Sequence, residues 1–138
     1  MKKSILLVLF TMVFVSCSQK ADLSQIGFIN GYWQISKVTD LDGNKKEYPI
    51  NEVYDFFEIK NNSGFHKKVT WQPDGTFLVN DLQENVKITI VNEEVMLDFS
   101  SKYGKHSENL ESVSKDEMVL VSKDQIRFIY KKVDVKSE

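Results

Sequence analysis

The amino-acid sequence predicts an all-β protein, an antiparallel up-and-down β-barrel of about eight strands. Turn-forming residues recur about every ten positions after residue 27, and short runs rich in β-branched and aromatic residues lie between them. Several runs alternate apolar and polar residues, which places one face of each strand on a core and the other in water. No apolar repeat of helical period persists for ten residues. So many antiparallel strands must close on themselves or fold over, and the hairpin-length connections favour the barrel over a two-sheet sandwich.

Residues 1–16 have the order of a bacterial lipoprotein signal peptide. Lys2 and Lys3 precede an apolar run of about 11 residues, and Ser16 and Cys17 follow it. The run is too short for a transmembrane helix, which needs roughly 20 residues. Residues 14–17 resemble the bacterial lipobox, although a lipobox usually has leucine in place of Phe14. The resemblance implies cleavage before Cys17 and attachment of lipid to its thiol, whereas the alternative is an ordinary secretory signal with an incidental cysteine.

Residues 17–27 are polar and without periodicity, which predicts a lipidated tether between the membrane and a folded domain. Several acyl chains on Cys17 would anchor the protein stably. Ser18 is not the aspartate that often retains lipoproteins at the inner membrane, so the expected location is the outer membrane. The sequence leaves open whether the domain faces the periplasm or the cell exterior.

A single barrel domain is expected over residues 28–133, followed by a polar tail at 134–138. Removal of the signal leaves 122 residues, which suits one domain. The signal takes two lysines from a chain of formal net charge −2, which leaves about −4 and argues against nucleic acid as a partner. Cys17 is the only cysteine, so no disulfide is expected and stability must come from an aromatic-rich core.

Alternation along residues 65–71 assigns side chains to the two faces of one strand. The residues expected to point inward are Phe65, Lys67, Val69 and Trp71. His66 and Lys68 then point outward, and His66 is expected to be a solvated surface histidine. The same reasoning places nine further side chains on inward faces: Val86, Ile88, Ile90, Val95, Leu97, Phe99, Ile126, Phe128 and Tyr130.

Two connections are predicted in detail. Proline and glycine in Trp71-Gln72-Pro73-Asp74-Gly75-Thr76-Phe77 favour a tight hairpin, because proline presets φ and glycine accepts a positive φ. Residues 110–118 are interpreted as two strands joined near residues 114–116, with a short helical turn as the alternative.

The start of the first predicted strand resembles the first-strand signature of the lipocalin fold. Asn30-Gly31-Tyr32-Trp33 contains its Gly-x-Trp, and in that fold the tryptophan plugs the closed end of the barrel. A basic residue from the end of the last strand, usually arginine, packs across it. The resemblance therefore implies that Gly31 and Trp33 are fold-signature residues and that Arg127, the only arginine, contacts Trp33.

The resemblance to small lipocalin-like envelope lipoproteins covers about residues 29–133. It includes the Asp42-Gly43 turn, the aromatic strand over 54–59, the Asp74-Gly75 hairpin and the final Tyr130-Lys131-Lys132 strand. The chain departs from secreted lipocalins because it is shorter, lacks their disulfides and has no predicted C-terminal helix. These departures leave the size of any ligand cavity open.

Nothing in the sequence predicts catalysis, a metal site or a cofactor. His66 and His106 are far apart and have no ligand-like spacing, and no nucleophile-elbow, zinc-protease or phosphate-loop motif is present. An inward Lys67 suggests a polar anchor for a ligand. Acids are plentiful, but no spacing selects a catalytic pair among Asp55, Glu58, Glu93, Glu94, Asp98, Glu108 and Glu111.

The leading functional hypothesis is a lipid-anchored, non-enzymatic module that binds a small hydrophobic ligand inside the barrel. The residues expected to line that pocket are Phe57, Phe65, Lys67, Trp71, Phe77, Phe99 and Phe128. The alternative is a filled barrel with a structural or protein-interaction role in the envelope. An exposed aromatic residue such as Tyr103 would then contact a protein partner.

Overall fold

The computed structural model describes residues 21–135, apart from the side chains of residues 79–82, so the expectations for residues 1–16 and Cys17 lie outside the described residues. A 3₁₀ helix, η1 (Leu23–Ile29), precedes nine strands. The strands are β1 (Gly31–Thr39), β2 (Lys45–Glu47), β3 (Val53–Lys60), β4 (Ser63–Trp71), β5 (Phe77–Val91), β6 (Glu94–Ser101), β7 (Gly104–Val113), β8 (Glu117–Ser122) and β9 (Arg127–Val133). No helix in this part of the chain is both long and apolar enough to cross a bilayer.

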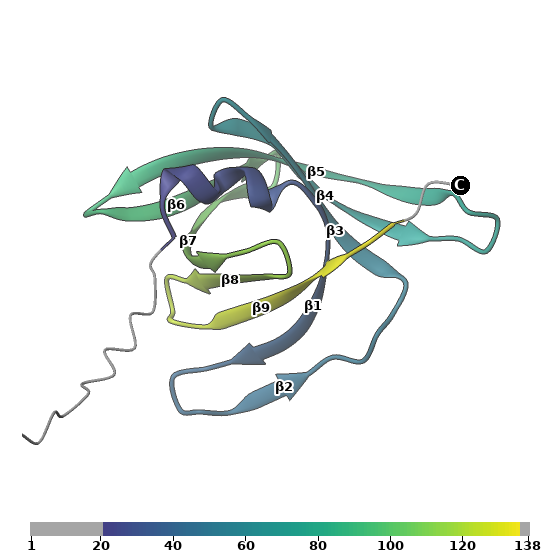
Figure 1. The fold of residues 1–138 in the computed structure, drawn as a ribbon, viewed down its shortest axis with the longest axis horizontal. Helices are drawn as coiled ribbons and strands as arrows, with labels where there is room; N and C mark the ends of the chain where they lie inside the picture. Colours follow the sequence, from purple (N-terminus) through teal and green to yellow (C-terminus); the bar gives the residue numbers. More distant parts are fainter. Residues whose placement is uncertain (1–20, 136–138) are drawn as a thin grey trace, which may run out of the picture.

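Eight of the strands form a closed antiparallel ring (Figure 1). Each strand from β3 to β9 pairs with the next along the chain, and β1 pairs with both β3 and β9. In the closing pair Tyr32 lies opposite Val133 and Thr39 lies opposite Arg127. The short β2 pairs with the far end of β1 outside the ring. The predicted up-and-down barrel is therefore confirmed.

The connections follow the turn chemistry of the sequence. Asn61 and Asn62 both have positive φ, 53° and 63°, as the two central residues of a tight hairpin require. In the predicted 71–77 hairpin, Gly75 has φ of 85° and its amide donates to the carbonyl oxygen of Gln72 at 2.9 Å. Residues 110–118 form the end of β7 and the start of β8, so the two-strand interpretation is confirmed.

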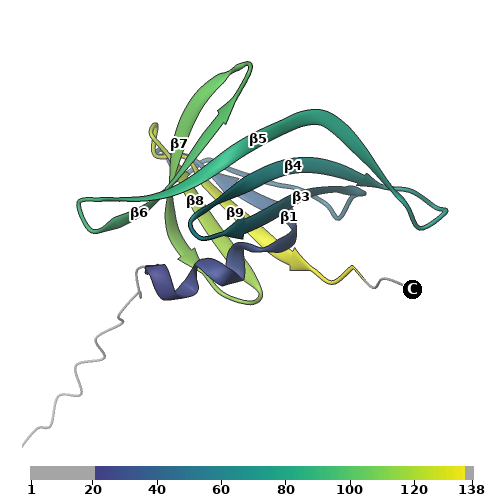
Figure 2. The ribbon, with the colours of Figure 1, turned by 90° about the horizontal axis from the view of Figure 1, so that it is seen from above.

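Helix η1 lies across one end of the ring (Figures 1 and 2). Asp22 accepts a hydrogen bond from the amide of Ser24, Gln25 completes a capping box, and Ile26 and Ile29 are buried. The predicted tether over 17–27 is therefore wrong from Ala21 onward, because these residues pack as part of the domain. A helix of two turns is too short to produce a detectable apolar period, so the sequence pattern gave no sign of it.

The apolar core fills the half of the barrel that η1 covers. Trp33 is fully buried, and its Nε1 donates to the carbonyl oxygen of Ile29 at 2.7 Å, which ties the first strand to the helix. Around it lie the buried side chains Phe57, Ile59, Val86, Ile88, Val95, Leu97, Phe99, Leu110, Val113, Met118 and Leu120. This end of the barrel is closed and packed.

Candidate functional site

Strand β4 faces the opposite way from the sequence prediction. In the register of β3 and β4, His66 lies opposite the buried Phe57 and Phe65 lies opposite the exposed Glu58. The His66 ring packs on Phe57 at 4.6 Å and on Phe99 at 5.9 Å between centroids. Its side chain is 13% exposed, so the expectation of a solvated surface histidine is wrong.

The seven predicted pocket residues divide between the two sides of the barrel wall. Phe57 and Phe99 are buried inside, and Phe128 packs against the same core. The other four lie on the outer face of the wall: Phe65, Lys67, Trp71 and Phe77. These four side chains contact one another or the rings of Tyr32 and Phe56. Tyr32 and Phe56 face outward, because the next residues along their strands, Trp33 and Phe57, point inward. The prediction that these four line an internal pocket is wrong, because β4 presents its more apolar side outward.

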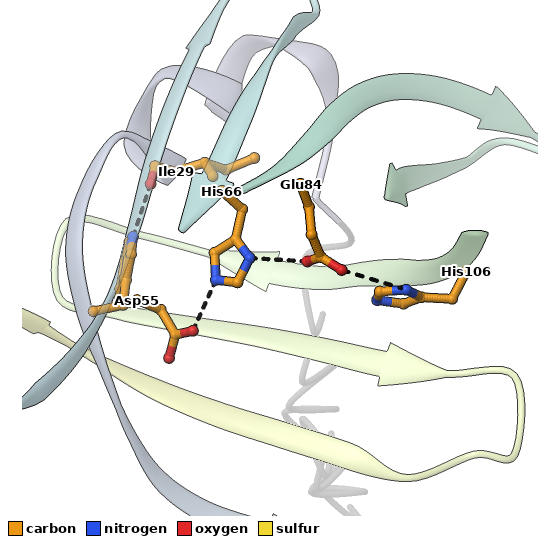
Figure 3. Close-up of polar contacts among 6 residues, drawn as sticks. Ile29, Asp55, His66, Glu84 and His106 are labelled. Carbon is orange, nitrogen blue, oxygen red and sulfur yellow. Dashed lines mark hydrogen bonds and ion pairs between the residues drawn. The ribbon is translucent and has the colours of Figure 1, made fainter. Parts of the chain in front are cut away.

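A polar network that runs from the buried Asp55 to the exposed His106 occupies the interior where the apolar core ends (Figure 3). His66 Nε2 lies 2.8 Å from Asp55 Oδ1, and His66 Nδ1 lies 3.0 Å from Glu84 Oε2. The second oxygen of Glu84 is 3.9 Å from Nδ1 of His106. The network therefore links β3, β4, β5 and β7 across the barrel interior (Figure 3).

The network changes the protonation of its members. Burial lowers the pKa of His66, but the hydrogen bonds and negative charges of Asp55 and Glu84 outweigh it, and the pKa is raised. Burial raises the pKa of Glu108. The pKa of Tyr130 lies well above its usual value, first because the phenol is buried and second because the surrounding carboxylates oppose its ionisation. This part of the interior therefore retains protons that solvent-exposed groups of the same types would release.

A cavity of about 990 Å³ opens at this end of the barrel, the barrel mouth. It reaches His66 and Glu84, and three lysines, Lys68, Lys102 and Lys105, stand around it. The remaining lining residues are Gln83, Asn85, Ser100, Ser101 and Tyr103. Its cationic side chains outnumber its single carboxylate, so the cavity favours a ligand with an anionic group.

The arrangement suits binding better than proton transfer. Both ring nitrogens of His66 are engaged by carboxylates, so the ring presents no free lone pair to a substrate. Among the side chains that the structure describes, no group of three or more His, Cys, Asp or Glu is placed to hold a metal ion. The network instead fixes the side chains at the base of the cavity.

The predicted contact between Arg127 and Trp33 is wrong. Arg127 binds Glu111 on the outside of the barrel, with Nη2 at 2.6 Å and Nε at 3.0 Å from the same carboxylate oxygen. Lys132 takes the expected place, with its Nζ 4.5 Å from the Trp33 ring centroid. In an antiparallel closure the start of the first strand meets the end of the last. Arg127 begins β9 and Lys132 stands near its end.

Sequence reasoning missed Glu84 as well as Lys132. Glu84 lies directly opposite His66 in the pairing of β4 and β5, so the inward orientation of one predicts that of the other. Gly31 occupies a position with φ of 117° where Lys132 Nζ comes within 2.7 Å of an added Cβ. The glycine of the Gly-x-Trp signature thus leaves room for the lysine that covers the tryptophan.

A family model matches this chain, and two solved structures are similar to it. The model of the lipocalin-like domain family matches residues 29–120. Among solved structures, a lipocalin-like protein from Bacteroides uniformis has 16% identity and a TM-score of 0.49, over 78% of this chain and 100% of that one. An uncharacterized protein from Bacteroides eggerthii has 12% identity and a TM-score of 0.47, over 75% and 98%. A comparison with curated proteins gave no match. Because the family model spans about two thirds of the chain, the protein belongs to the lipocalin-like domain family.

Proposed function

We propose that this protein is a lipid-anchored binding module that takes a small, mainly hydrophobic molecule with one anionic group at the mouth of its barrel. The observation that carries the proposal is the division of the interior. One half is packed with apolar side chains beneath η1, and the other holds a cavity of about 990 Å³ above a buried His–carboxylate network. A cavity of this size suits a small organic ligand. The lipocalin-like fold supports a hydrophobic ligand-binding barrel.

The three lysines give the proposed ligand its orientation. Lys68, Lys102 and Lys105 are exposed on the cavity rim, where they remain hydrated until a ligand arrives. A carboxylate or phosphate would contact these ammonium groups, and the apolar part would lie beside Tyr103. Lys68 thus replaces Lys67 as the proposed polar anchor, because Lys67 lies on the outer face.

Native mass spectrometry of the full protein, recovered from the envelope of its source in a mild nonionic detergent, tests this proposal. We expect an excess mass that disappears on denaturation. Ser101→Trp places a large ring at a cavity-lining position on the same face of β6 as the buried Phe99 and should abolish the excess mass. Glu58→Trp places the same ring at an exposed position of β3 and should leave it unchanged. A bare polypeptide mass for the unaltered protein in repeated preparations would refute the ligand.

The proposed anchor is the lipidated thiol of Cys17, with the outer membrane as its location. The signal-like order of residues 1–16 supports it, and so does the short distance from Cys17 to the domain. The Ala21 amide donates to the carbonyl oxygen of Glu111 at 3.3 Å, so only residues 18–20 separate Cys17 from the folded chain. Four residue steps span at most about 14 Å. The domain would therefore lie close to the membrane surface.

Fractionation of cells tests the anchor. Cys17→Ser should move the protein from the membrane pellet to the soluble fraction. Ser18→Asp should leave it membrane-bound but shift it from the outer to the inner membrane on a density gradient. Membrane association that survives Cys17→Ser would contradict lipidation at this residue, and an unchanged gradient position for Ser18→Asp would contradict the role of Ser18.

A second candidate function, contact with an envelope protein, is favoured by the exposed apolar side chains near the cavity. Tyr103 is 72% exposed at the tip of the β6–β7 hairpin, where Lys102 Nζ lies 5.1 Å from its ring centroid. Photo-crosslinking from position 103 in intact cells tests this candidate. A specific protein adduct that is absent from position 124, an exposed site in the β8–β9 turn, would favour it; equal labelling at both positions would argue against it.

A further inference from the structure

The outer wall of the barrel carries a continuous group of aromatic rings that the proposed ligand site does not use. We call it the outer aromatic surface, and its members are Tyr32, Tyr54, Phe56, Phe65, Trp71 and Phe77. The rings of Tyr32 and Phe56 are 4.7 Å apart, and those of Phe56 and Phe65 are 5.9 Å apart. Phe77 stacks on Tyr32 at 5.0 Å and meets Trp71 edge-on at 5.4 Å. These rings come from β1, β3, β4 and β5, on the side of the wall opposite His66.

One half of this surface already holds a cation. The ammonium group of Lys67 lies 5.4 Å from the Phe56 ring centroid and 5.3 Å from that of Phe65. Both distances fall within the range of a cation–π interaction. The chain therefore supplies its own ammonium group to two of the six rings.

The other half lines an open groove of about 960 Å³. Four rings stand in its lining, those of Tyr32, Tyr54, Trp71 and Phe77. The hairpin residues Pro73, Asp74 and Gly75 and the chain end Val133, Asp134 and Val135 complete it. Two carboxylates thus border the rings, and no lysine, arginine or histidine is among the described residues that line the groove.

The two carboxylates have no cationic partner within the described lining of the groove. Hydrogen bonds from Thr76 hold the pKa of Asp74 below its usual value. Asp134 is exposed and also lines the groove. An aromatic lining with a negative border attracts a cation through the faces of the rings and through the field of the carboxylates.

We propose that this groove binds a small organic cation, an alkylammonium or quaternary ammonium group. Charge complementarity selects this occupant, because the groove combines aromatic faces with two aspartates, and the neighbouring rings already accept the ammonium of Lys67. The groove is separate from the barrel mouth, since its residues lie on the other face of the wall. It does not depend on a ligand inside the barrel.

Choline provides the probe, and its uncharged carbon isostere 3,3-dimethylbutan-1-ol provides the matched control. The full protein in a nonionic detergent is titrated with each compound while tryptophan fluorescence is recorded. Trp71 is partly exposed in the groove and Trp33 is fully buried, so the change should come from Trp71. We expect choline to give a saturating change that Trp71→Phe removes, and the isostere to bind at least about tenfold more weakly.

Charge variants identify the groove as the site. Asp134→Asn should weaken choline binding at least about threefold, whereas Asp124→Asn, an exposed aspartate in the β8–β9 turn, should not change it. Equal binding of the isostere would show an apolar groove without cation selectivity and would overturn the proposal. Absence of saturation with choline, or an unchanged affinity in Asp134→Asn, would overturn it as well.

Discussion

Lys132 covers Trp33. The two residues lie opposite each other in the pairing that closes the barrel, and Lys132 Nζ stands 4.5 Å from the Trp33 ring centroid. The same ammonium group donates to the carbonyl oxygen of Asn30, just before the first strand. One side chain from the end of β9 therefore holds the ring, the start of β1 and the closing pair together.

Replacement of Lys132 should cost more stability than replacement of Arg127. Lys132→Met keeps the length of the side chain but removes the cation over Trp33 and the bond to Asn30, and we expect a loss of about 1–2 kcal/mol. Arg127→Met breaks an ion pair whose side chains are 46% and 44% exposed, and should cost less than about 1 kcal/mol. Urea unfolding of both variants makes the comparison. A larger loss of stability for Arg127→Met would contradict this assignment and favour the predicted contact between Arg127 and Trp33.

Trp33 and Trp71 should differ in their contribution to the free energy of unfolding. Trp33 is fully buried and bonded to Ile29, so Trp33→Ala should destabilise the domain by about 3–5 kcal/mol. Trp71 is partly exposed on the outer wall, and Trp71→Ala should cost less than half as much. Denaturant titration followed by circular dichroism measures both. Similar losses would mean that the outer aromatic surface contributes as much as the core.

Stability should fall as the pH rises above the unfolded pKa of histidine. The pKa of His66 is raised in the folded state because two carboxylates stabilise the imidazolium. A raised histidine pKa adds stability that is complete below about pH 6.5 and is lost as the pH passes through the folded pKa. The midpoint of urea unfolding should therefore decrease above about pH 6.5.

His66→Gln should flatten this part of the pH profile, because the glutamine cannot carry the charge. His106→Gln is the matched control, since His106 is 51% exposed and 3.9 Å from Glu84. Its profile should keep the decrease. The pKa of Glu108 is also raised, so the stability that this group contributes is lost as the pH rises from about 4.5. That loss begins about two pH units below the loss expected from His66, so the two contributions are separable. A decrease that persists in His66→Gln would assign the pH dependence to another group.

Gly64 should tolerate no side chain. A Cβ at this position would lie 1.8 Å from the carbonyl oxygen of Glu58 and 2.9 Å from Cα of Ile59, both in the adjacent strand backbone. Gly64→Ala must push β3 and β4 apart, and we expect a loss of at least about 3 kcal/mol or failure to fold. Gly27→Ala is the control, because nothing lies within 4 Å of its added Cβ. Thermal unfolding of the two variants tests this; equal melting temperatures would show that the strands can separate without cost.

The strands and their order were predictable from the sequence because each strand is local. Turn residues such as Asn61-Asn62 and Pro73-Asp74-Gly75 mark where each strand ends, and antiparallel neighbours follow from short connections. The Gly-x-Trp resemblance located the packed end of the barrel at Trp33. For most strands the apolar face also faced inward, as in Val95, Leu97 and Phe99.

The site was less predictable because alternation identifies two faces but does not say which one points inward. In β4 the aromatic side packs on other outward rings, so Phe65 lies outside while His66 turns in toward Asp55 and Glu84. The pairing with β5 also shifts register, because four residue steps of β5, from Gln83 to Val79, lie opposite two of β4, from Lys67 to Val69. Cross-strand register decides the orientation, and it depends on residues far apart in the sequence. The partner of Trp33 was missed for the same reason.

Because β9 is the last strand and closes the ring against β1, we expect closure to be a late step in the folding of this domain. The pairing of β9 with β1 brings together Asn30 and Lys132, which are 102 positions apart, so its formation closes a long loop at a cost in chain entropy. We therefore expect the domain to fold more slowly than a helical domain of equal length. A chain that ends before Arg127 leaves one edge of β1 and one edge of β8 without a partner, as templates for intermolecular sheet growth. The seven residues of β9 thus separate a self-contained barrel from an aggregation-prone open sheet.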